Sequence, residues 1–374
     1  MATRLDETVN VIADLGNTGL KDMLVGHVGT EDVIPHALYT PNEASYQAKK
    51  RRALYSPAAM RSSVIFEKVW KTDGGDVHQA YIVGDEALQS GQAKKITGAD
   101  KYQSGYFDVL VAAKLLRRFP QGHNNIRMAV AHPPDAIPFV DKLMDLVGGV
   151  HRVITLDGRA VKFVVREVIP WDEPAGGLMR FMTIPGQEYN PHDIRAGMRL
   201  LVIDIGGKIS SMTTVTIGEN KSIEPLYGAK TSPVFPMGIQ DAAGLLREEL
   251  RSLYPDEFQP IRDIPQDMLE MALQEHRVMI ANQPFDCQQA VLNAIYPLLD
   301  TIDGIYRNDM AAGRIFNHII VTGGGGGLLF RYLYQDILKH QFVHLADLPE
   351  RIHLANLRGG SESFKVWLAR QERK

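Results

Sequence analysis

Two segments of the chain place an aspartate and glycines directly after an apolar, β-branched run. Residues 9–19 read VNVIADLGNTG, and residues 200–209 read LLVIDIGGKI. A glycine-containing turn exposes backbone N–H groups, which can form a nest for an anion. An aspartate at the end of a strand can hold Mg²⁺ through its waters, because this ion keeps several of them. Both segments therefore contain groups that can bind a phosphate and its metal.

The first segment carries Asp14, Gly16 and Gly19, and Lys21 follows closely. Lys21 could reach a phosphate as a point charge. The alternative is an ordinary hairpin in which Asp14 and Asn17 cap the turn. For a single loop this alternative would be preferred, but the second segment repeats the arrangement.

The repeat predicts a duplicated fold. Asp14 and Asp204 lie 190 residues apart, which is about the length of one domain. Strand-like residues follow each segment, at 20–28 and 212–217, so each segment is predicted to form a β-hairpin. We expect the two hairpins to face one another across a cleft.

A third glycine-rich element follows later in the chain. Residues 318–327 read HIIVTGGGGG and lead into a helical pattern. A strand that enters five glycines at the start of a helix suits close approach to a nucleotide. The alternative is a flexible turn, but five glycines cost backbone entropy when they become ordered, which weakens that reading.

Two other nucleotide motifs are disfavoured by the sequence. The P-loop pattern Gly-x-x-x-x-Gly-Lys-Ser/Thr fails because Ile209 follows Gly207-Lys208 and Val202 occupies the upstream glycine position. The dinucleotide pattern Gly-x-Gly-x-x-Gly fails because Leu328 stands where its third glycine is needed. A P-loop ATPase and a Rossmann dehydrogenase are therefore both disfavoured.

The composition is that of a globular protein with room for two domains. Of 374 residues, 45% are apolar and 23% are charged. The formal net charge of −3 gives no general reason to expect nucleic acid, and no direct nucleic-acid motif is present. The single cysteine, Cys287, excludes an internal disulfide and a cysteine-cluster zinc site. We expect no membrane span and a cytoplasmic location, because neither a long apolar run nor a secretory signal is present.

Strand and helix patterns are mixed along the chain, which favours an α/β fold. Further strands are predicted at residues 80–83, 126–131, 161–169 and 318–322. Helical periodicity is clearest at residues 107–119, 239–254, 267–280, 288–307 and 328–340. Loops are predicted at residues 39–59, 170–177 and 185–197, and the domain boundary is placed in the last of them.

The order of the three glycine-containing elements resembles the actin, sugar-kinase and DnaK-type chaperone superfamily. Its signature is two Asp-x-Gly phosphate hairpins followed by a Gly-Gly-Gly adenosine loop. A lysine seven residues after the first aspartate is similar to that of actins and their prokaryotic relatives. Residues 81–87 (YIVGDEA), 168–170 (VIP) and 355–359 (ANLRG) resemble segments of ParM/StbA proteins and archaeal actin homologues. The chain is identified as a ParM-like actin homologue on this resemblance.

The resemblance implies an actin-like fold with two duplicated ribonuclease-H-like domains that flank a nucleotide cleft. Domain I would comprise residues 1–187 and 353–374, with a small subdomain at about 30–100. Domain II would comprise residues 188–352, with a helical subdomain at about 238–316. The implied function is an ATPase that binds ATP or ADP with Mg²⁺ and forms filaments, for plasmid or DNA segregation or another cytoskeletal role. Implied partners are other copies of the chain and a DNA-bound adaptor protein.

The resemblance also assigns residue roles. Asp14 and Asp204 would face magnesium and its waters, Lys21 the β- and γ-phosphates, and Glu173 the attacking water. A solvent-facing loop residue is an equal reading for Glu173. The remaining nucleotide contacts would come from Gly16, Asn17, Thr18, Gly19, Gly206, Gly207, Lys208, Gly323, Gly324 and Gly325.

The second hairpin departs from the family pattern. Relatives usually carry threonine and an acidic residue where this chain has Ile209 and Ser211, although Lys208, Ser210 or Ser211 could compensate. Two alternatives therefore stay open: a small-molecule kinase of the same superfamily, and a nucleotide-binding scaffold that does not hydrolyse. The basic run at residues 49–52 (KKRR) could contact DNA or another protomer, or be a solvated surface.

Overall fold

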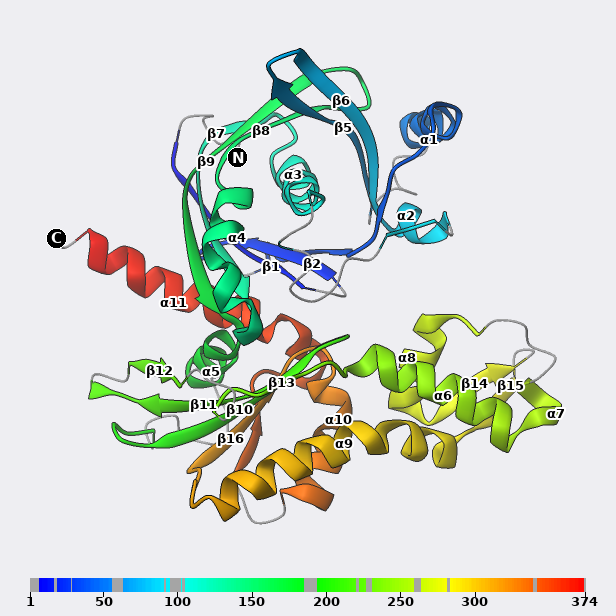
Figure 1. Ribbon diagram of the computed structural model, residues 1–374, viewed down its shortest axis with the longest axis vertical. Coiled ribbons are helices and arrows are strands. Elements are labelled where there is room, and N and C mark those ends of the chain that lie inside the picture. Colours follow the sequence, from blue (N-terminus) through cyan, green and yellow to red (C-terminus); the bar gives the residue numbers. More distant parts are fainter. Residues whose placement is uncertain are drawn as a thin grey trace. The chain divides into compact units, whose positions relative to one another are not determined.

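The computed structural model describes residues 7–372 apart from the segments 17–18, 28, 56–62, 91, 95–101, 103–104, 185–193, 220–221, 227–230, 259–263, 281–282 and 339–341. The chain forms two compact units (Figure 1). The first comprises Met1–Asp172 with Gly360–Lys374, and the second comprises Glu173–Gly359.

The first unit is built on one nine-stranded sheet. Its strands are β1 (Val9–Leu15), β2 (Gly19–Leu24), β3 (Asp32–Pro35), β4 (Leu38–Tyr39), β5 (Ser63–Thr72), β6 (Gly75–Gly84), β7 (His123–His132), β8 (Gly149–Ile154) and β9 (Ala160–Asp172). They lie in the order β3-β2-β1-β7-β9-β8-β5-β6-β4. The central strands β1, β7 and β9 are parallel, and the other neighbours pair antiparallel.

Helices cover both faces of this sheet. They are α1 (Glu43–Tyr55), α2 (Asp85–Gln89), α3 (Phe107–Arg118), the 3-10 helix η3 (Pro134–Phe139), α4 (Val140–Val147) and the later part of α11 (Ala355–Gln371). Side chains alternate along β1. Val11 and Ala13 belong to the core that contains α3, whereas Ile12 lies against Gly360 of α11. The apolar run of β1 is therefore explained by burial on both faces.

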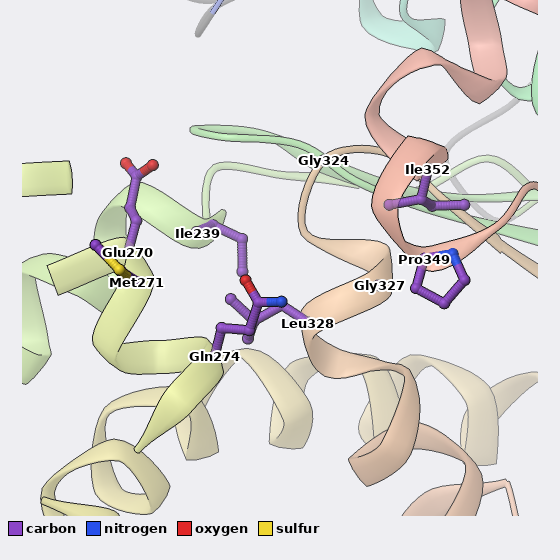
Figure 2. Close-up of a pocket in the computed structure, with 9 residues that line it drawn as sticks. All are labelled: Ile239, Glu270, Met271, Gln274, Gly324, Gly327, Leu328, Pro349 and Ile352. Carbon is purple, nitrogen blue, oxygen red and sulfur yellow. The ribbon is translucent and has the colours of Figure 1, made fainter. Parts of the chain in front are cut away.

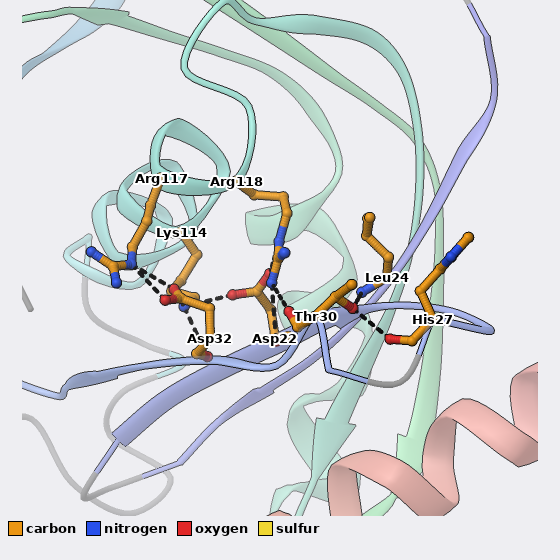
Figure 3. A network of polar contacts seen from close by, with 8 residues as sticks. All are labelled: Asp22, Leu24, His27, Thr30, Asp32, Lys114, Arg117 and Arg118. Atoms are coloured by element: carbon orange, nitrogen blue, oxygen red, sulfur yellow. Dashed lines mark hydrogen bonds and ion pairs between the residues drawn. The ribbon is translucent and has the colours of Figure 1, made fainter. Parts of the chain in front are cut away.

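A buried polar network joins α3 to the hairpin strand β2 and to β3 (Figure 3). The Lys114 side chain is 1% exposed, and its ammonium lies 2.5 Å from a carboxylate oxygen of Asp22 and of Asp32. Arg118 pairs with Asp22, and Arg117 pairs with Asp32, both at 2.6 Å. Removing one partner would leave a buried charge uncompensated, so the network fixes α3 against the hairpin.

The second unit contains a six-stranded sheet and a separate hairpin. Its strands are β10 (Arg199–Ile205), β11 (Ser210–Ile217), β12 (Ile223–Pro225), β13 (Val234–Phe235), β14 (Arg277–Ile280), β15 (Gln283–Asp286), β16 (His318–Thr322) and β17 (Val343–Leu345). The sheet order is β12-β11-β10-β16-β17, with β13 paired to β11, while β14 and β15 pair with each other.

Helices also cover both faces of the second sheet. They are α5 (Glu173–Thr183), α6 (Ile239–Leu253), α7 (Pro255–Phe258), α8 (Gln266–Glu275), α9 (Gln288–Ala311), α10 (Gly326–Tyr332), the π-helix η6 (Leu333–Ile337), the 3-10 helix η7 (Pro349–Leu354) and the start of α11. Leu201 and Ile203 of β10 pack in a core with α6 and α9. Leu200 and Val202 pack in a second core with α5. Both hairpin strands that lead into an aspartate are thus central strands, buried on two faces.

Two predicted loops contain regular secondary structure, which corrects those predictions. Residues 170–172 complete β9, and residues 173–177 begin α5. Pro174 is compatible with this helix, because proline is tolerated in the first helical turn. Gly177 allows close packing there, because its Cβ would lie 2.9 Å from the side chains of Thr322 and Asn356. In the range 39–59, Glu43–Tyr55 forms α1, whose glutamate, alanine, glutamine, lysine and arginine residues favour a helix.

The predicted helix at 267–280 is shorter than expected. The backbone at His276 is left-handed, with φ of 58°, which ends α8 at Glu275. Residues 277–280 then form β14. The unit boundaries also differ from those predicted, since the first unit ends at Asp172 and resumes at Gly360. The reason is that α5 and the start of α11 pack with the second sheet.

Candidate nucleotide-binding site

The first hairpin joins a buried carboxylate to a lysine. β1 and β2 pair antiparallel, with Asp14 directly opposite Lys21. The Lys21 ammonium lies 2.8 Å from the Asp14 carboxylate, and their side chains are 15% and 5% exposed. The structure therefore brings these two predicted residues together as an ion pair. Asn17 and Thr18 of the same turn lie outside the described residues.

The carbonyl of Gly16 is fixed from outside the hairpin. The ring Nδ1 of buried His36 lies 2.7 Å from this oxygen, so His36 donates a hydrogen bond to it. A Cβ on Gly16 would lie 3.1 Å from the Asp14 carboxylate, and a Cβ on Gly19 would lie 3.4 Å from Val33. Gly16 therefore lies close to the aspartate, and Gly19 lies close to β3.

A histidine and a second aspartate lie at the same sheet edge as Asp14. The carboxyl ends of parallel β1, β7 and β9 bring Asp14, His132 and Asp172 to one edge. The Nε2 of His132 lies 3.6 Å from the Asp172 carboxylate. The sequence analysis missed this pair. The only signal was that His132 directly follows the strand predicted at 126–131, whereas Asp172 falls in the loop predicted at 170–177.

The second hairpin has its turn fastened to α6. β10 and β11 pair with Asp204 opposite Ser211, and the Gly206 N–H donates to the Ile209 carbonyl at 3.1 Å. The carbonyls of Gly206 and Gly207 accept N–H groups from the first turn of α6 at 3.1 and 2.8 Å. These bonds hold the turn carbonyls toward the helix.

The polar side chains late in this hairpin already have partners. Lys208 forms a 2.8 Å ion pair with Asp241 of α6. The Ser210 hydroxyl donates to the Met237 carbonyl at 2.8 Å. Lys208, Ser210 and Ser211 were expected to compensate for the unusual second loop. Of these, Lys208 and Ser210 already interact with other groups of the protein.

The glycine-rich loop packs against the end of β10. Gly323 has φ of 82°, a conformation that favours glycine. A Cβ on Gly323 would lie 2.3 Å from the Asp204 carboxylate, and a Cβ on Gly325 would lie 2.3 Å from Ile239. The Gly325 N–H also donates to the Ile205 carbonyl at 2.8 Å. The structure therefore brings the predicted glycine loop and the second aspartate together.

A hydrogen-bonded chain reaches Asp204 from two other elements. Thr322 of β16 donates its hydroxyl to the Asn356 side-chain oxygen at 2.7 Å. The Asn356 amide donates to the Asp204 carboxylate at 3.0 Å. Sequence reasoning missed both residues, although Asn356 lies in the segment 355–359 that carries part of the family resemblance.

A pocket of about 300 Å³ opens beside the glycine loop (Figure 2). Its wall combines apolar groups for the face of a ring with the carboxylate of Glu270 and the amide of Gln274, which can pair with polar edges. α6, α8, α10, η7 and the glycine loop supply the lining residues, which are Ile239, Glu270, Met271, Gln274, Gly324, Gly327, Leu328, Pro349 and Ile352.

The carboxylates of Asp14 and Asp204 are hard oxygen donors of the kind that Mg²⁺ prefers. Asp14 belongs to the first unit, and Asp204 to the second. Within the described residues, no group of three or more histidine, cysteine, aspartate or glutamate side chains could hold a metal.

Glu173 is the half-buried first residue of α5. Among the described helices, none is long and apolar enough to span a membrane.

Comparisons with known proteins agree with this architecture. Residues 13–176 match the family model described as the N-terminal domain of actin-like proteins. A comparison with curated proteins finds no match.

Solved structures give the fold of the whole chain. The archaeal actin homologue Ta0583 is 17% identical with a TM-score of 0.69, over 96% of this chain and 99% of that one. A ParM from a 15-stranded filament of Clostridium botulinum is 18% identical with a TM-score of 0.70, over 96% and 99%. The actin-like protein Alp7A is 12% identical with a TM-score of 0.69, over 98% and 99%. The chain therefore has an actin-like fold, and its residues 13–176 match the N-terminal domain of actin-like proteins.

Proposed function

We propose that this protein is a nucleotide-binding, filament-forming ATPase with a cytoskeletal role such as plasmid or DNA segregation. One observation carries the proposal most directly. In the second unit, a pocket lined by Gly324 lies beside a glycine loop whose Gly323 contacts the Asp204 carboxylate. A base pocket followed by a close-packed backbone turn and an acidic group suits a nucleotide with its phosphates and metal.

Each group of residues would bind a different part of the metal–nucleotide complex. The pocket would hold the base, and the N–H group of Gly207 would contact a phosphate oxygen. Lys21 would exchange its pairing with Asp14 for a phosphate. Bound Mg²⁺ would neutralise phosphate charge, and Asp14 and Asp204 would hold its waters.

Hydrolysis in this scheme depends on positioning and electrostatics, because phosphoryl transfer needs little covalent chemistry from the protein. Glu173 is the proposed residue that orients the attacking water. A solved structure of Ta0583 with ADP has the same fold as this chain, with a TM-score of 0.69. That relative supports nucleotide binding as the family function from which the proposal starts.

Sedimentation tests filament formation. We expect the protein to pellet in the presence of ATP and Mg²⁺ and to pellet less with ADP. A chain that stays monomeric at high concentration with both nucleotides would contradict the filament proposal.

Phosphate release tests the catalytic assignment separately. Asp204→Ala should slow phosphate release from ATP without any acceptor present, since the variant loses the proposed ligand for the metal waters. An unchanged rate would remove Asp204 from the site. Release that requires an added acceptor would instead favour a kinase.

A second candidate is a nucleotide-binding scaffold without hydrolysis. It is favoured by the second hairpin, where Lys208 and Ser210 are engaged with Asp241 and the Met237 carbonyl. Tight nucleotide binding without phosphate release would support this candidate over the ATPase.

A further inference from the structure

We propose that Asn356 is a positioning residue that holds the Asp204 carboxylate in the orientation required for a metal–nucleotide complex. This role rests on the proposed function, because it needs Asp204 to face bound Mg²⁺ through its waters. Asn356 is the second residue of α11, and it lies 152 positions from Asp204 in the chain. The two residues are therefore distant in the sequence and meet only in the folded chain.

The backbone places Asp204 and Thr322 side by side. β10 and β16 are parallel neighbours, and Asp204 is the register partner of Thr322. Asn356 bridges their side chains, with its oxygen 2.7 Å from the Thr322 hydroxyl and its nitrogen 3.0 Å from the Asp204 carboxylate.

The chemistry of the three groups fixes the direction of this chain. An ionised carboxylate only accepts hydrogen bonds, so the Asn356 NH₂ must face Asp204. The amide oxygen is then left to accept from the Thr322 hydroxyl. The two bonds together select one of the two orientations of the amide.

Burial makes the arrangement rigid. Asp204, Thr322 and Asn356 are 8%, 0% and 7% exposed. A Cβ on Gly177 of α5 would lie 2.9 Å from both the Asn356 side-chain oxygen and the Thr322 hydroxyl. The amide therefore has no room to turn away on that side. On the other side of the carboxylate lies Gly323, whose Cβ would approach Asp204 to 2.3 Å.

A neutral donor is suited to this position. It stabilises the charge on Asp204 without cancelling it, so the carboxylate keeps its attraction for a cation. Groups that orient a metal-facing ligand through a hydrogen bond typically change metal affinity by about 10–100-fold when removed.

The test compares nucleotide affinity with and without Mg²⁺, using a fluorescent ADP. In Asn356→Ala we expect the gain in affinity from Mg²⁺ to fall by about 10-fold or more. The metal-free affinity should stay close to that of the wild type. Ser363→Ala, on the same helix, is the matched control and should retain the full gain. An unchanged Mg²⁺ gain in Asn356→Ala would overturn the role.

A second variant separates positioning from folding. Thr322→Val keeps the shape but removes the hydroxyl that orients the amide, so a smaller loss of the Mg²⁺ gain is expected. A folded Thr322→Val protein that keeps the full Mg²⁺ gain would contradict the role of the Thr322 hydroxyl in orienting the amide.

The wild-type chain distinguishes the two proposals. If it binds ADP more tightly with Mg²⁺ and Asn356→Ala does the same, only the positioning role fails. If it binds no nucleotide with or without Mg²⁺, the proposed function fails and the positioning role fails with it.

Discussion

Gly325→Ala should destabilise the second unit, because the added methyl has no space. Its Cβ would lie 2.3 Å from Cγ1 of Ile239 and 2.6 Å from Cγ2 of Ile205. Carbon atoms in contact are normally about 3.5–4.0 Å apart. Both neighbours are buried, β-branched and therefore restricted in rotamer. The loop itself is held by the Gly325 N–H bond to the Ile205 carbonyl.

Overpacking of this kind costs about 1–3 kcal/mol. The second unit spans Glu173–Gly359. In a unit of that size, each kcal/mol lowers the midpoint of thermal unfolding by about 2–4 °C. We therefore expect Gly325→Ala to lower the midpoint by about 2–12 °C. Circular dichroism or calorimetry without nucleotide measures it, and if the units unfold separately only one transition should move.

Gly324→Ala is the matched control, because Gly324 lies next to Gly325 in the same loop but has space for a methyl group. The nearest heavy atom to its Cβ would be Cβ of His353, at 3.9 Å. Its free energy of unfolding should change by no more than an ordinary surface substitution does, about 0.5 kcal/mol. Since Gly324 lines the pocket, its affinity for nucleotide should nevertheless fall. A Gly325→Ala protein that unfolds at the wild-type temperature would refute the packing argument.

Two further predictions concern charged pairs of the first unit. Burial raises the pKa of the Asp32 carboxyl, but hydrogen bonds and positive charge from Arg117 and Lys114 outweigh it and lower the pKa to about 2. This shift contributes about 2 kcal/mol to the free energy of unfolding. The contribution is present above the unfolded pKa near 4 and is lost as the pH falls through about 2. Denaturant unfolding of Asp32→Asn at a series of pH values should therefore lack this part of the pH dependence. Lys21→Met should destabilise the protein by about 1–3 kcal/mol, because it removes the cation beside buried Asp14. Adding Asp14→Asn should recover stability but not nucleotide affinity, and a double variant no more stable than Lys21→Met would contradict the pairing argument.

Local pattern was sufficient to predict the two hairpins and the strand before the glycine loop. β1 and β10 are buried on both faces, so they read as apolar runs that lead into the aspartate. The predicted strand at 318–322 is β16 without a shift at either end. The helices predicted at 107–119 and 239–254 correspond to α3 and α6 within one residue.

Local pattern failed where a distant contact decides the structure. Gly176 and Gly177 read as a loop, yet they lie in α5, where a Cβ on Gly177 would come within 2.9 Å of Thr322 and Asn356 and a Cβ on Gly359 within 1.7 Å of the Gly176 carbonyl oxygen. His276 gave no signal of the left-handed turn that ends α8. The same limit applies to the site: Asn356 could be found only once the fold had placed α11 beside β10.

The two duplicated aspartates are held by different chemistry, and this sharpens what the duplication means. Asp14 is paired with a cation from its own hairpin, so the first turn is close to neutral before any ligand arrives. Asp204 accepts a hydrogen bond from the amide of Asn356, which is neutral and so orients the carboxylate without itself cancelling its charge. In the proposed function, a phosphate would have to compete with Asp14 for Lys21, whereas the amide of Asn356 would not compete with a cation that approaches Asp204. The repeat preserves a strand, an aspartate and a turn, while the electrostatic character of each copy is set by its partner. Sequence similarity between the two loops thus predicts a shared shape better than a shared role.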